Sequence, residues 1–180
     1  TGSEHGYVSS SAPETNDMIA HTLTHMMADQ CGMPADKQSN VFHRRPDGSY
    51  PALFGHALNT GQGFYTNDPH RHPASTGLPQ GHIPIRNFLT VPALVGYRVV
   101  GQIALANSDH DYSDRQLDAI ARMAMLYALA VERMRRQNAL KAGEERYALA
   151  QKAADIGTWD WNIVIGTLLR NPLEAQLAHH

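Results

Sequence analysis

Residues 113–154 read SDRQLDAIARMAMLYALAVERMRRQNALKAGEERYALAQKAA and contain no proline. Ser113 and Asp114 are residue types that cap the first free amides of a helix, so this stretch predicts one long helix that begins here. Between Ala119 and Val131 every residue except Arg122 is apolar. A helix that covers one sheet needs only a single apolar stripe, so this helix is predicted to be buried on two sides.

The predicted helix has two apolar faces with different expected partners. We expect the first face to lie on a sheet, and it consists of Leu117, Ile120, Ala121, Ala124, Tyr127, Ala128 and Val131. We expect the second face to pack against the same helix of a second chain, giving a homodimer. Its interface residues are Met123, Leu126, Ala130 and Met134. In the alternative, a further helix of the same protein covers this second face.

The composition excludes several classes of protein. The chain has 180 residues, enough for one domain and part of a second, and 42% of them are hydrophobic. Its net charge is -2 without a block of like charge, which argues against a nucleic-acid partner. No apolar run approaches the roughly 18 residues of a membrane span, so no membrane contact is expected. The single Cys31 excludes an internal disulfide and fits a cytoplasmic location.

Short alternating segments upstream of the helix predict an antiparallel sheet. Together with a short helix that has proline near its start and glycine after its end, they indicate an α+β domain. The predicted strands are Gly6–Ser10, Met18–Met27, Gln62–Thr66, Asn87–Val95, Tyr97–Asn107 and Trp159–Ile163, and the short helix is Pro51–Asn59. Asn67–Arg86 is irregular and holds four prolines, which is typical of a binding loop or a lid.

Several short motifs of the sequence, taken in order, resemble those of a GAF domain. They include Thr60-Gly61, Asn67-Asp68-Pro69, Phe88-Leu89-Thr90-Val91-Pro92 and the stretch from Val100 to Asn107. The most similar subgroup is the one found in bacterial sensor histidine kinases and diguanylate cyclases. The resemblance assigns residues 1–137 to the GAF domain, without the helix that usually precedes its first strand. It leaves 138–156 as a helical linker, and residues 157–180 resemble the beginning of a PAS domain.

The resemblance implies a sensory or regulatory domain that binds a small ligand or relays a signal through a dimeric helix. The fragment itself would not be an enzyme, although the full-length protein would end in a kinase or a cyclase. The resemblance places a ligand pocket under the 67–86 loop, and the identity of the ligand and of any cofactor stays open. The candidate ligand-binding residues are Phe64, Tyr65, Asn67, Asp68, His82, Arg86 and Phe88. Asn67 and Asp68 could equally form turns, and the aromatic residues could belong to the core.

Three rival hypotheses concern metal binding, redox chemistry and ligand-free dimerisation. His21 and His25 would lie about 13 Å apart on a strand, too far for one metal ion. His70, His72 and His82 share one loop without supporting cysteine or carboxylate spacing, so no metal is expected. A methionine sulfoxide reductase of this fold needs more cysteines than one. A domain that only dimerises remains an open alternative, and His179-His180 fits both native residues and an affinity tag.

Overall fold

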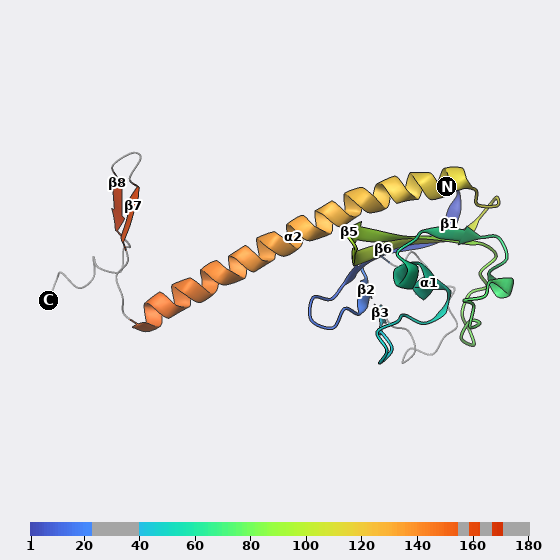
Figure 1. Ribbon diagram of the computed structural model, residues 1–180, viewed down its shortest axis with the longest axis horizontal. Coiled ribbons are helices and arrows are strands. Elements are labelled where there is room, and N and C mark those ends of the chain that lie inside the picture. Colours follow the sequence, from blue (N-terminus) through green and yellow to red (C-terminus); the bar gives the residue numbers. More distant parts are fainter. Residues whose placement is uncertain (23–39, 155–158, 163–166, 171–180) are drawn as a thin grey trace. The chain divides into compact units, whose positions relative to one another are not determined.

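The computed structural model describes residues 1–22, 40–154, 159–162 and 167–170. The chain divides into two compact units, Thr1–Arg133 and Met134–His180. The first unit contains a six-stranded antiparallel sheet with helices (Figure 1), so the predicted α+β class is confirmed. The order of its strands is β3-β2-β1-β6-β5-β4, and the second unit contains an antiparallel pair of strands, β7-β8.

The elements of the first sheet alternate with two helices and a short 3-10 turn. In chain order they are β1 (Ser3–Ser11), β2 (Met18–Ala20), β3 (Val41–Phe42), α1 (Ala52–Thr60), β4 (Phe64–Thr66), the 3-10 turn η3 (Pro69–Arg71), β5 (Phe88–Val95), β6 (Arg98–Ser108) and α2 (Asp114–Ala154). The second pair of strands is β7 (Trp159–Asn162) and β8 (Thr167–Arg170).

Strands β5 and β6 form a hairpin inside the sheet, over the ranges where the sequence predicts two successive strands. The two strands pair from Phe88 opposite Ala106 to Val95 opposite Arg98. Gly96 occupies the turn with a φ of 61°, a left-handed conformation that favours glycine. On its other side β6 pairs along most of β1, so β1 and β5 flank β6. The interior of the domain is therefore organised around β6.

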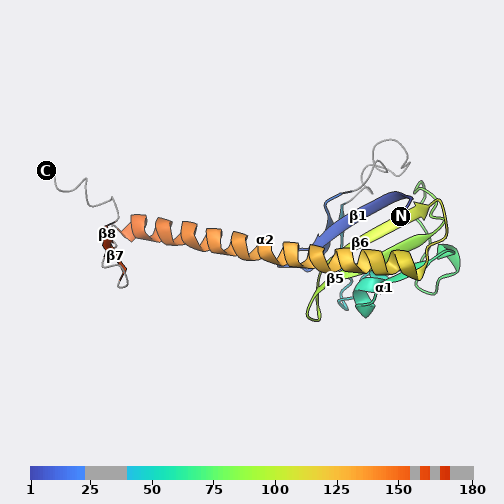
Figure 2. The same cartoon turned by 90° about the horizontal axis from the view of Figure 1, so that it is seen from above.

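The first part of α2 covers one face of the sheet (Figure 2). Ile120 and Ala124 pack against Leu89, Val91 and Ile103. Further along the helix, a second buried cluster joins Ala93, Val100, Ala128 and Val131. The first predicted apolar face of the helix therefore lies on the sheet, as expected from its three-four spacing.

The helix begins where its capping residues predict. The backbone N–H and the hydroxyl of Ser113 both donate to Oε1 of Gln116. The Ser113 carbonyl accepts the N–H groups of Gln116 and Leu117. This reciprocal arrangement satisfies groups that every helix start leaves without intrahelical partners.

Helix α1 lies on the opposite face of the sheet and is held by buried polar groups. The amide of Gln102 donates to the Phe54 carbonyl at 2.8 Å and also to the Thr90 hydroxyl. The Tyr7 hydroxyl donates to Oε1 of Gln102 at 3.4 Å, and burial raises the pKa of Tyr7 above its ordinary value. Pro51 precedes α1, and Gly61 ends it with a φ of 68°, as the sequence predicts.

Two predictions about the early strands are wrong. Strand β2 spans only Met18–Ala20, and His21 lies after it with an exposed side chain whose Nε2 is 2.7 Å from the Ser10 hydroxyl. Residues 21 and 22 form no strand, and the remainder of the predicted strand, 23–27 with His25, falls outside the described residues, as does Cys31. The sequence predicts no strand at Val41–Phe42, where β3 forms, because a strand this short shows no alternating pattern and is stabilised by its pairing with β2.

Candidate functional site

The start of the 67–86 loop is tied to the residue that precedes the capped end of α2. Oδ1 of Asn67 accepts the N–H of Tyr112 at 2.8 Å, and Nδ2 of Asn67 donates to the Tyr112 carbonyl at 3.0 Å. The neighbouring Asp68 accepts the N–H of Arg71 at 3.3 Å and so caps the 3-10 turn. Both side chains are therefore engaged in the local structure of the domain.

The aromatic candidates divide between the two faces of the sheet. The ring of Phe64 lies 5.0 Å from that of His56, 4.9 Å from that of His72 and 6.3 Å from that of Phe88. The next residue, Tyr65, packs into the core beneath α2, and its hydroxyl donates to Asp114 at 3.3 Å. Successive strand residues point to opposite faces, so Phe64 and Tyr65 cannot line the same side of a pocket.

The remaining candidates bond to their own surroundings. Nδ1 of His82 lies 2.8 Å from the carbonyl of Ile83. The backbone N–H of Arg86 donates to Asn107 at 2.8 Å, and its exposed guanidinium donates to Glu4 at 3.3 Å. The structure therefore brings Phe64 and Phe88 together but does not gather the seven candidates around one cavity. A role of these residues in ligand binding stays a prediction.

His56 and His72 join helix α1 to the loop. Their rings lie 5.2 Å apart in an edge-to-face arrangement, and Nδ1 of His72 accepts the N–H of Ala74 at 3.1 Å. Burial lowers the pKa of His72 below its ordinary value, and the charge of His56 adds to this effect. The folded domain therefore favours the neutral form of His72.

The lowered pKa of His72 predicts a loss of stability in acid. Above its ordinary pKa of 6.5, the folded and unfolded forms are both neutral, and the packing of His72 contributes fully. As the pH falls through 6.5 the unfolded chain takes up the proton first, so the contribution declines towards the lower folded pKa. We expect the melting temperature to fall further between about pH 7.5 and 5.5 in the native chain than in His72→Phe. Thermal denaturation measures both chains, and an equal fall of the melting temperature in the two would contradict a contribution of neutral His72 to stability.

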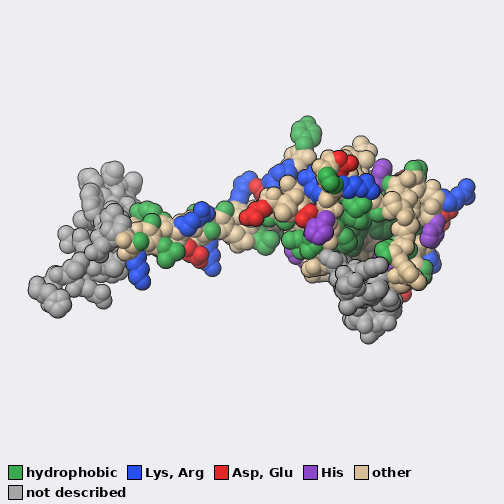
Figure 3. Space-filling model, turned by 90° about the horizontal axis from the view of Figure 1, so that it is seen from below, with side chains coloured by type: hydrophobic (Ala, Val, Ile, Leu, Met, Phe, Trp, Pro, Cys, Tyr) green, Lys and Arg blue, Asp and Glu red, His purple; other side chains and the backbone are tan. Residues whose placement is uncertain are grey.

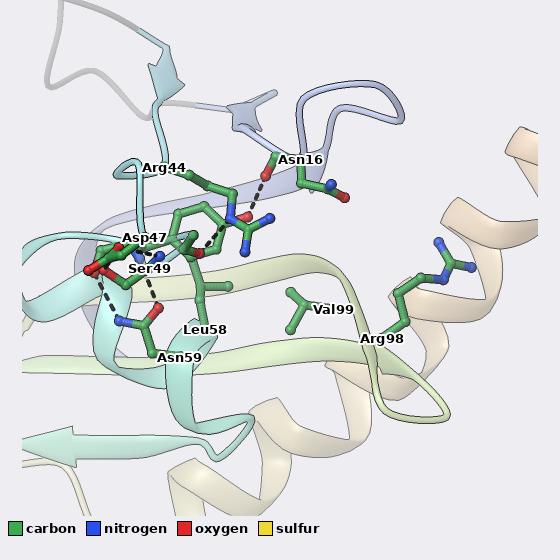
Figure 4. A pocket seen from close by; sticks show the side chains of 10 residues that line it. Asn16, Arg44, Asp47, Ser49, Leu58, Asn59, Arg98 and Val99 are labelled. Atoms are coloured by element: carbon green, nitrogen blue, oxygen red, sulfur yellow. Dashed lines mark hydrogen bonds between the residues drawn. The ribbon is translucent and has the colours of Figure 1, made fainter.

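A cavity of about 480 Å³ opens beside the α1 face of the sheet, away from the seven candidates (Figure 4). It joins residues from segments that are far apart in sequence. Its lining consists of Asn16, Arg44, Asp47, Gly48, Ser49, Tyr50, Leu58, Asn59, Arg98 and Val99. None of these residues was predicted, because no single segment carries a recognisable binding motif. Charged and polar side chains surround an apolar floor formed by Leu58 and Val99.

Metal chemistry gives no other site in the described part of the chain. Basic and acidic side chains lie interspersed on the face shown in Figure 3. The residues that the structure describes contain no group of three or more histidine, cysteine, aspartate or glutamate side chains placed to hold a metal ion. No helix among them combines the length and the apolar character that crossing a bilayer requires.

The second apolar face of α2 is exposed in the single chain. Met123 is 56% exposed, Leu126 is 69% exposed and Met134 is 48% exposed, and Ala130 is exposed as well. These positions lie beside the buried stripe on the helix. The described residues cover only the face on the sheet, so the burial of the second face by another helix stays a prediction.

The comparisons with known proteins agree with this fold. A family model described as GAF domain matches residues 1–132. A GAF domain of a phosphoenolpyruvate-protein phosphotransferase from Coxiella burnetii aligns with a TM-score of 0.59 and 13% identity, covering 76% of each chain. A GAF domain/HD domain protein from Geobacter sulfurreducens aligns with a TM-score of 0.52 and 21% identity, covering 74% of this chain and 83% of the other.

At these identities the two structures support the fold alone, whereas the family model covers most of the sequence. GAF domains are generally sensory or regulatory modules rather than catalytic ones, in keeping with the function that the sequence predicts. Through residues 1–132, this chain belongs to the GAF domain family.

Proposed function

We propose that this chain is the sensory part of a bacterial signal-transduction protein and that it relays its state through a dimer of α2. One observation carries the proposal: α2 buries one apolar stripe on the sheet and exposes a second, formed by Met123, Leu126, Ala130 and Met134. Exposed apolar side chains that continue along one side of a helix commonly mark an interaction surface. The same helix of a second copy offers an identical stripe.

The helix connects the proposed interface to the sheet within one continuous element. Ile120, Ala124 and Val131 lie on the sheet, while Met123 and Leu126 lie on the proposed interface. A change in the sheet that moves the buried stripe must therefore also move the exposed one. A small ligand would shift this equilibrium only if it bound one arrangement of the helices more tightly than the other.

A second part of the proposal names the domain to which α2 connects and the class of the complete protein. We propose a PAS domain that begins near residue 157, supported by the antiparallel pairing of Trp159–Asn162 with Thr167–Arg170. The resemblance favours a sensor histidine kinase or a diguanylate cyclase as the complete protein, with a cytoplasmic location. The fragment would then supply regulation, and catalysis would belong to an output domain.

Replacing one residue of the exposed stripe tests the dimer. We expect the native chain to have twice its 19.8 kDa mass in light scattering, and Leu126→Glu to have the mass of a single chain, because two carboxylates would face each other across the interface. Met125→Glu is the matched control. Met125 is 67% exposed, but it lies about 100° around the helix from Leu126 and outside the proposed interface.

Three results would overturn the dimer. The native chain could have the mass of one copy at every concentration, Leu126→Glu could remain a dimer, or both glutamate variants could dissociate it equally. The third result would mean that the general hydrophobicity of α2, rather than the proposed stripe, drives association. Circular dichroism of both variants would establish that the fold is retained.

A further inference from the structure

The cavity beside α1 is lined by an exposed arginine whose guanidinium is oriented by two contacts. Nε of Arg44 donates to the carbonyl of Gly48 at 2.6 Å, and its guanidinium carbon lies 5.4 Å from the centre of the Tyr50 ring. The two terminal nitrogens of Arg44 bond to none of the described residues. A guanidinium fixed in this way presents a planar pair of donors, which matches a carboxylate better than a lysine does.

The support beneath Arg44 is itself fixed. The Tyr50 hydroxyl donates to the carbonyl of Asn16. The side chain of Asn59 accepts the N–H of Tyr50 at 2.8 Å and donates to its carbonyl at 2.9 Å. Tyr50 is also buried against Met18 and Leu58. The ring on which the Arg44 guanidinium lies is therefore preorganised, which favours affinity for an anion.

The other residues that line the cavity restrict the charge and the polarity of the ligand. Oδ1 of Asp47 accepts both the N–H and the hydroxyl of Ser49, and these bonds lower the pKa of Asp47. Asp47 is therefore negative at neutral pH and disfavours a second negative charge on the ligand. Leu58 and Val99 offer apolar contact to the remainder of the molecule (Figure 4).

We propose that this cavity binds a small monoanionic carboxylate with a short apolar body, and that the terminal nitrogens of Arg44 hold its carboxylate. The inference rests on the proposed sensory function, because it names the class of molecule that the domain would sense. It assigns the ligand to a place outside the 67–86 loop.

Arg98 provides a connection from this cavity to α2. It lines the cavity, and it also donates to Glu132 of α2 at 2.7 Å. The negative charge of a carboxylate held by Arg44 would also attract the Arg98 guanidinium through space, in competition with Glu132. Binding would therefore weaken one contact between the end of the β5–β6 hairpin and α2, close to the residues that face the proposed dimer.

Butyrate is the probe for the first test, with inorganic phosphate and succinate as comparisons at equal ionic strength. We expect butyrate to raise the melting temperature saturably, and succinate and phosphate to do so less. Arg44→Gln should weaken butyrate binding about tenfold or more, as expected for a lost charge-assisted pair. Arg44→Lys keeps the positive charge but not the pair of donors, so its affinity for butyrate should lie between those of the native chain and Arg44→Gln. Arg45→Gln removes the neighbouring arginine, which does not line the cavity, and should bind like the native chain.

Several results would overturn the site. They are the absence of saturable butyrate binding, equal binding to Arg44→Gln, or an equal loss in Arg45→Gln. Tighter binding of phosphate or succinate would overturn the proposed ligand class. Arg44→Lys keeps the test decisive if Arg44→Gln does not fold. Measuring the mass of the chain in solution separates failure of the ligand site from failure of the proposed relay. A chain that is dimeric but does not bind butyrate would overturn the site and leave the dimer in place.

Glu132→Gln tests the connection to α2. If binding draws Arg98 away from Glu132, removing the competing carboxylate should strengthen butyrate binding several-fold, by the reciprocity of coupled equilibria. Unchanged affinity would overturn the connection while leaving the Arg44 site intact. Weaker affinity would show that the Arg98–Glu132 pair supports the cavity and would also overturn it.

Discussion

Replacing Gly101 by alanine is expected to destabilise the domain by about 3 kcal/mol or more. A Cβ atom at this position would lie 2.3 Å from the carbonyl oxygen of Ser9 and 2.9 Å from Cε1 of Tyr127. The first of these neighbours is backbone in β1, the strand that pairs with β6, so relief requires the two strands to separate. The measurement is the free energy of unfolding in urea, monitored by circular dichroism.

Gly143→Ala is the matched control for this substitution. Nothing lies within 4 Å of the Cβ that it would add to α2, and alanine favours a helix over glycine by about 1 kcal/mol. We therefore expect Gly143→Ala to be neutral or stabilising. A Gly101→Ala variant as stable as the native chain would contradict the close packing of β1, β6 and α2.

Replacing Asn67 by alanine is expected to cost about 2 kcal/mol. Its side chain makes two hydrogen bonds to the backbone of Tyr112, and alanine makes neither. Asp68→Ala is the matched control, because it removes the neighbouring carboxylate, which is exposed at the start of the 3-10 turn, and should cost less. Urea unfolding measures both variants, and faster hydrogen exchange at the Tyr112 amide would locate the lost contact.

The Asn67 experiment also separates structure from ligand binding. A structural tether predicts reduced stability whether or not a ligand is present. Native stability in Asn67→Ala would contradict that tether. If such a variant also lost binding of a small molecule, that result would support the ligand-binding role predicted for Asn67 from the sequence.

Local chemistry made several elements predictable. Gly96 between two alternating segments indicated the β5–β6 hairpin, and the Pro51 and Gly61 pair indicated α1. The capping residues and the three-four spacing of Ile120 and Ala124 indicated α2 and its face on the sheet. Each of these patterns depends only on a few neighbouring residues, so it can be recognised in the sequence alone.

Pairing over long distances was not predictable in the same way. The length of β2 depends on its partners β1 and β3, and the alternating pattern continued past the end of the strand. The cavity joins Asn16, Arg44, Leu58 and Arg98 from separate segments, and none of them belongs to a motif. The opposite orientations of Phe64 and Tyr65, by contrast, follow from strand alternation, and applying that rule would have divided the predicted pocket.

Cross-linking at Leu126 tests most directly whether two copies of α2 lie side by side. In a Cys31→Ser background, Leu126→Cys should form a covalent dimer on oxidation, because a two-fold interface brings equivalent residues close enough for a disulfide. Asp118 lies on α2 away from the stripe, so Asp118→Cys should form no covalent dimer on oxidation. A Leu126→Cys variant that stays monomeric, or cross-links no faster than Asp118→Cys, would contradict the dimeric relay.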